Sequence, residues 1–98
     1  MISKVEVIRQ DTVLGEYELD DGETVTIGRH PTNTIHIDEP SVSRLHAYIT
    51  REKDTLIISD RNSKVGIAVN GAMVKSVQLK DGDTIKIGKK HSLRVSIS

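Results

Sequence analysis

Short runs of alternating apolar and polar residues repeat along the chain, with turn residues between them. The clearest runs are residues 23–28, 84–88 and 92–98. A period of two is typical of half-buried strands, and no apolar series with helical spacing occurs. About ten such strands separated by turns predict an all-β sandwich.

The other strands follow from the same pattern. They are expected near residues 4–10, 13–19, 35–37, 45–50, 55–59, 65–69 and 72–74. Leu45, Ala47 and Ile49 should share one face of their strand, with His46 on the other. The consecutive apolar residues 56–58 predict a strand buried on both faces. Asn70-Gly71 predicts a two-residue hairpin, because both residues tolerate positive φ.

Composition narrows the class of protein. A length of 98 residues suits one domain, expected to cover residues 1–98. With 29% charged and 36% apolar residues, the chain fits neither a disordered nor a membrane-inserted protein. The net charge is zero, which argues against a nucleic-acid-binding domain. The absence of cysteine and of an N-terminal apolar run leads us to expect a cytoplasmic protein.

The polar loops between the predicted strands contain residue types that bind anions. Arg29, Ser43 and Arg44 stand at the mouths of two loops, and residues 60–64 form a third polar loop. The planar fork of arginine matches the oxygens of a phosphate or carboxylate, and a serine hydroxyl adds another donor. These loops therefore predict a site for an oxyanion.

Five segments carry a resemblance to a known family. They are Gly28-Arg29, Ser43–Ala47, Asp60–Gly66, Val69–Gly71 and Leu79–Gly88. In this order and spacing the chain resembles the forkhead-associated (FHA) domain, a phosphothreonine-peptide-binding module. The resemblance implies a two-sheet antiparallel β-sandwich of about eleven strands, with the peptide bound by loops at one end.

The resemblance also implies roles for single residues. Arg29 and Ser43 are expected to contact the phosphate. Arg44 occupies a position that can supply a further phosphate donor, and the alternative is a surface ion pair of Arg44 with Asp38 or Glu39. Lys64 lies where the family often places a polar phosphate contact, and the alternative is an ordinary exposed lysine.

Three more residues are expected to support the binding loops, and one departs from the family pattern. His46 resembles the family's buried histidine, which braces the loops, and Gly28 and Gly66 should permit tight backbone there. Val65 replaces the asparagine that hydrogen-bonds the peptide main chain in the family. Valine has no polar side-chain atom, and losing one such bond typically costs about 0.5–1.5 kcal/mol.

The resemblance leads us to expect a non-enzymatic signalling or adaptor module. Its partner would be a Thr-phosphorylated protein or peptide downstream of a Ser/Thr kinase, and the domain itself would be a monomer. No cofactor, nucleic acid or membrane insertion is expected. The alternative is a degenerate FHA domain used in phosphorylation-independent assembly, in which Val65 and Ile67 form an apolar patch.

Other kinds of chemistry find little support in the sequence. Ser43 and His46 are expected on opposite faces of one strand, and the chain has no Gly-x-Ser-x-Gly elbow. These features argue against a hydrolase. The four histidines lack the compact spacing of a metal site, so no bound metal is expected.

Overall fold

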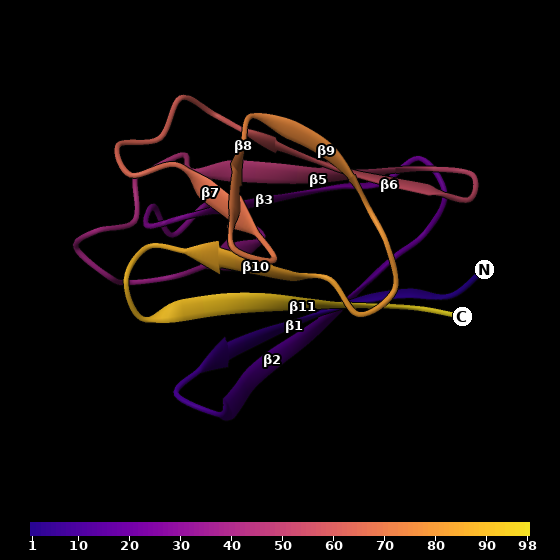
Figure 1. Cartoon of the computed structure of the whole chain (residues 1–98), viewed down its shortest axis with the longest axis horizontal. Helices are drawn as coiled ribbons and strands as arrows, with labels where there is room; N and C mark the ends of the chain where they lie inside the picture. The colour runs from indigo at the N-terminus through magenta and orange to yellow at the C-terminus, as the bar shows by residue number, and fades with distance from the viewer.

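The computed structural model describes residues 1–98 as eleven strands in two sheets that pack face to face (Figure 1). In spatial order, one sheet contains β2 (Thr12–Leu19), β1 (Ser3–Arg9), β11 (His91–Ile97), β10 (Thr84–Ile87), β7 (Ile67–Val69) and β8 (Ala72–Val74). The other contains β4 (Ile35–His36), β3 (Thr24–Gly28), β5 (Ala47–Glu52), β6 (Thr55–Asp60) and β9 (Ser76–Leu79). The predicted sandwich of about eleven strands is confirmed, and only the short β3–β4 pair is parallel. No helix long and apolar enough to cross a membrane is present.

The core lies between the two sheets and consists of aliphatic side chains. Nineteen buried apolar residues form one cluster, to which both sheets contribute. Ile27, Ile49 and Ile58 come from one sheet, and Leu93 and Val95 come from the other. Because Phe and Trp are absent, β-branched residues and leucine fill this space, as the alternating pattern predicts.

Two of the expected strand faces are wrong. Leu45 is 50% exposed and His46 is fully buried, because β5 begins only at Ala47 and the preceding residues are not extended. Ile57 is exposed, whereas Leu56 and Ile58 are buried, so β6 is not buried on both faces. The alternation in β6 shows that its second face points to solvent.

The strand expected at residues 65–69 begins two residues later. Gly66 has a φ of 79°, which ends the alternation before β7 starts at Ile67. Val65 is therefore exposed, and Ile67 is completely buried in the core. A surface patch of Val65 with Ile67 does not form, so that expectation is wrong.

The polar loops gather at one end of the sandwich. The chain termini lie at the opposite end, where the backbone N–H of Ile2 donates to the carbonyl of Ser98 at 2.7 Å (Figure 1). The predicted hairpin between β7 and β8 is confirmed, because Asn70 and Gly71 both have positive φ, at 50° and 87°. The loop end thus rests on a scaffold of paired strands.

Candidate functional site

Backbone hydrogen bonds hold the first two loops side by side. The N–H of Arg29 donates to the carbonyl of Ser43 at 2.9 Å, and the N–H of His30 donates to the carbonyl of Arg44 at 3.3 Å. A Cβ at Gly28 would lie 2.8 Å from the carbonyl carbon of Arg44. This approach is closer than real Cβ atoms tolerate, so only glycine fits at the start of the first loop.

Asn33 joins the same two loops through its side chain. Its Nδ2 donates to the carbonyls of His30 and Arg44, both at 2.8 Å, and the residue is buried. Our sequence interpretation missed Asn33. The alternation of a strand gave no signal for it, because Asn33 lies in the loop before β4.

Arg29 is exposed, but a hydrogen bond from its Nε–H holds the guanidinium group in place. The Nε–H donates to the carbonyl of Val42 at 3.0 Å. The two terminal amino groups make no hydrogen bond or ion pair within the chain. A planar guanidinium held at Nε presents these remaining N–H groups in a fixed direction, which suits an oxyanion ligand.

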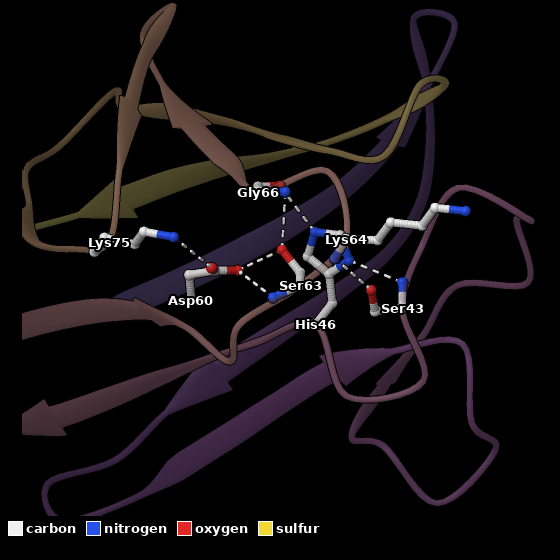
Figure 2. A network of polar contacts seen from close by, with 7 residues as sticks. All are labelled: Ser43, His46, Asp60, Ser63, Lys64, Gly66 and Lys75. Atoms are coloured by element: carbon white, nitrogen blue, oxygen red, sulfur yellow. Dashed lines mark hydrogen bonds and ion pairs between the residues drawn. The ribbon is translucent and has the colours of Figure 1, made fainter.

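Ser43 and His46 connect the second loop to the third (Figure 2). The backbone N–H of Ser43 donates to Nδ1 of His46 at 3.0 Å, so the imidazole carries its proton on Nε2. That Nε2–H donates to the carbonyl of Gly66 at 3.0 Å. The N–H of Lys64 donates to Oγ of Ser43 at 2.9 Å. The hydroxyl hydrogen of Ser43 therefore remains available for a ligand.

Asp60 is a buried acid that holds the third loop through hydrogen bonds. Its side chain is 1% exposed, and Oδ1 accepts hydrogen bonds from the N–H and the hydroxyl of Ser63. The Oγ of Ser63 in turn accepts from the N–H of Gly66 at 2.9 Å. The Nζ of Lys75 lies 3.8 Å from Oδ2 of Asp60, which has no hydrogen bond. Both functions of the Ser63 hydroxyl are thus used within the loop, unlike those of Ser43.

The other two expected contact residues are exposed. Lys64 and Arg44 make no side-chain ion pair, so the alternative pairing of Arg44 with residues 38–39 is not observed. Hydrogen bonds bring Arg29, Ser43 and the backbone of Lys64 together. Arg44 follows Ser43 directly, and its side chain points to solvent.

Glu39 is a buried carboxylate that ties the second loop to the β10–β11 turn. It accepts hydrogen bonds from the hydroxyl of Ser41 and from the N–H groups of Lys89 and Lys90, and His91 Nδ1 lies 3.6 Å away. Burial alone would raise the pKa of Glu39, but these hydrogen bonds and His91 outweigh it and hold the pKa below its usual value. The carboxylate therefore stays ionised and keeps the loop in place.

Comparison with known proteins identifies the family. The FHA domain model matches residues 25–88. The oxoglutarate dehydrogenase inhibitor of Corynebacterium jeikeium is 39% identical over 83 residues, which are 85% of this chain and 58% of that protein. The chain thus spans little more than half the length of this curated relative.

Solved structures agree with this family. An FHA domain from a study of phosphothreonine-dependent FHA domain interactions superposes with a TM-score of 0.89 at 28% identity, over 100% of this chain and 98% of that chain. EmbR of Mycobacterium tuberculosis, in complex with a low affinity phosphopeptide, superposes with a TM-score of 0.85 at 31% identity, over 99% of this chain and 24% of EmbR. The chain belongs to the FHA domain family.

Proposed function

We propose that this domain binds Thr-phosphorylated segments of partner proteins and holds the phosphate with Arg29, Ser43, Arg44 and Lys64. The observation that carries the proposal is the fixed guanidinium of Arg29 beside a serine whose hydroxyl hydrogen is unused. A phosphate monoester brings a charge of about −1.5 to −2 and three strong acceptor oxygens. Cationic and hydroxyl donors arranged around one point match that group.

The family membership supports the same ligand. Two related FHA structures are described by phosphothreonine-dependent interactions and by a bound phosphopeptide. We infer a cytoplasmic partner phosphorylated by a Ser/Thr kinase. The inhibitory activity named for the Corynebacterium relative belongs to a longer protein and is not carried over to this chain.

The geometry favours binding over catalysis. Ser43 and His46 both precede β5, so the expectation that they lie on opposite faces of one strand is wrong. A better argument is chemical, because Nδ1 of His46 accepts the N–H of Ser43 and Nε2–H donates to the carbonyl of Gly66. Neither nitrogen is free to take a proton from a nucleophile.

A titration of three matched peptides tests the proposal. The peptides carry phosphothreonine, phosphoserine or unmodified threonine in one sequence, and isothermal titration calorimetry measures each Kd. We expect the unmodified peptide to bind at least tenfold more weakly than the phosphothreonine peptide, because it lacks the dianion that the site matches. The family resemblance implies weaker binding of phosphoserine as well. Equal affinity for the phosphorylated and unmodified peptides would overturn the proposal.

One observation favours a second candidate function, in which the domain joins an assembly independently of phosphorylation. Val65 is 42% exposed in the third loop, at the position where the family has a peptide-binding asparagine. Met73 is 66% exposed, and its methyl group lies close to Gly66, which follows Val65 in the chain. Exposed apolar side chains near binding loops fit a protein contact that needs no phosphate.

Asparagine at position 65 provides a direct test of how much the replacement costs. We expect Val65→Asn to tighten phosphothreonine-peptide binding by about two- to tenfold, which corresponds to one added hydrogen bond of about 0.5–1.5 kcal/mol. Val65→Ala is the matched control, because it removes the apolar side chain without adding a polar one. If the two variants bind equally, the third loop does not bring residue 65 to the peptide main chain.

A further inference from the structure

Cations on the outer face of the six-stranded sheet are paired unevenly. Toward the chain termini, Lys4 pairs with Glu16 at 3.2 Å and Arg94 pairs with Glu6 at 2.9 Å. Toward the loop end, Lys86 on the same face makes no ion pair. Since the whole chain is electrically neutral, an excess of cations over carboxylates at one end is a local feature of this surface.

Three lysines surround a hollow on that part of the face. Lys86 is registered opposite Ser92, and Ser92 is registered opposite Ile8, so these residues cross β10, β11 and β1 in one row. Lys89 and Lys90 follow in the β10–β11 turn. The hollow has a volume of about 350 Å³, and we call it the basic hollow. Its lining includes Ile8, Asp11, Lys86, Lys89, Lys90 and Ser92.

The charge balance of the basic hollow is positive. Its three lysines face a single carboxylate, that of Asp11, and none of the four groups makes an ion pair within 4.0 Å. Lysines with no partner in the chain attract an anionic ligand with less competition than paired ones. Ile8 provides an apolar floor against which the methylene groups of a long acidic side chain can pack.

The basic hollow adjoins the candidate phosphate site through the β10–β11 turn. The N–H of Lys89 donates to Oγ of Ser41 at 2.9 Å, and a Cβ at Gly88 would lie 2.7 Å from Cγ2 of Val42. Val42 precedes Ser43 and accepts the hydrogen bond from Nε of Arg29. The turn and both loops lie at the same end of the sandwich (Figure 1).

We propose that the basic hollow binds an acidic segment, rich in Asp and Glu, that flanks the phosphothreonine of the same partner. This inference rests on the proposed function and adds a chemical class to the partner sequence. The molecule measures 34 × 27 × 27 Å, so about eight extended residues at roughly 3.3 Å each cross its end face. Acidic residues within about eight positions of the phosphothreonine therefore reach the hollow.

The test compares acidic and neutral flanks at constant phosphate. Four phosphothreonine peptides carry Glu or Gln on the N-terminal side and on the C-terminal side in all combinations, and a fifth, fully acidic peptide is unphosphorylated. Fluorescence anisotropy measures each Kd at about 50 and 300 mM NaCl, between which the Debye length shortens about 2.4-fold. We expect at least one acidic flank to tighten binding by about three- to tenfold at the lower salt, with most of the gain lost at the higher salt.

Two triple variants locate the effect. Lys86→Gln, Lys89→Gln and Lys90→Gln together should abolish the preference for the acidic flank and leave the preference for phosphate in place. The control combines Lys4→Gln, Lys53→Gln and Lys80→Gln, which remove the same charge elsewhere on the domain. In two-dimensional NMR, the backbone amides of residues 89–92 should shift with the acidic peptide and not with the neutral one.

Each outcome decides between the inference and the proposed function. The basic hollow does not bind the flanking segment if acidic and neutral phosphopeptides bind equally, or if the first triple variant retains the preference for the acidic flank. If binding ignores phosphate but still needs the three lysines and the acidic residues, the proposed function falls and the hollow stands as an acid-binding site. Equal binding of a single-stranded oligonucleotide would overturn its assignment to a protein segment.

Discussion

Replacing Arg29 with alanine is expected to weaken binding of a phosphothreonine peptide by at least about 100-fold. Hydrogen bonds from a charged donor contribute about 1.5–3 kcal/mol each, and the free edge of Arg29 offers two of them to a phosphate. The Nε–H is already bound to the carbonyl of Val42, so the guanidinium needs little ordering when the ligand arrives. Calorimetric titration of the variant with the phosphorylated and unmodified peptides measures the loss.

Two further variants separate charge from geometry in this experiment. Arg29→Lys keeps the positive charge but loses the planar fork, so we expect an intermediate loss of about tenfold. Lys80→Ala removes one positive charge at the opposite end of the domain and should bind within about twofold of the native protein. The assignment of Arg29 is refuted if Arg29→Ala binds within threefold of the native domain, or if it weakens both peptides equally.

Much of the fold is predictable from the sequence because periodicity reports which face of a strand is buried. Residues 23–28, 84–88 and 92–98 alternate cleanly, and each forms a strand whose apolar side chains enter the core. The predictions fail where the chain is not extended. Leu45 and Val65 lie in loops, and there the parity of a neighbouring strand says nothing about burial.

The candidate site is predictable only in part, for a physical reason. Motifs with fixed spacing identify residues whose side chains face a ligand, such as Arg29 and Ser43. They do not identify the residues that hold the loops in place without facing the ligand. Asn33, Glu39 and Asp60 act through hydrogen bonds to groups 2–51 positions away in the chain, and the distant partners follow from the folded structure alone.

Asp60 illustrates how indirect the support for the site is (Figure 2). Its carboxylate orients Ser63, Ser63 accepts the N–H of Gly66, and the carbonyl of Gly66 accepts Nε2–H of His46. His46 then fixes the backbone of Ser43. The buried carboxylate of Asp60 is thus connected through three intermediate residues to Ser43, a candidate phosphate-binding residue. Asp60 itself does not take part in the proposed contact with the phosphate.

Alanine at position 60 is therefore expected to affect both stability and binding. Removal of the carboxylate leaves the half-buried N–H and hydroxyl of Ser63 without their acceptor, which costs about 1–3 kcal/mol for each unpaired group. We expect a loss of about 3 kcal/mol in the free energy of unfolding and about tenfold weaker phosphopeptide binding. Urea unfolding followed by circular dichroism measures the first, and calorimetry measures the second.

Asparagine at the same position shows whether Asp60 acts as an acceptor or as a charge. Asp60→Asn keeps one oxygen for Ser63, so its loss of stability should be about 1 kcal/mol and its binding close to native. The ¹⁵N shifts of the His46 ring should keep the Nε2–H pattern in Asp60→Asn and lose it in Asp60→Ala, because the alanine variant releases Gly66. Asp38→Ala, an exposed acid in the neighbouring loop, should change stability by less than about 0.5 kcal/mol. If Asp60→Ala behaves like Asp38→Ala in all three measurements, the third loop does not depend on Asp60 and is held by His46 and by the hydrogen bond from Lys64 to Ser43.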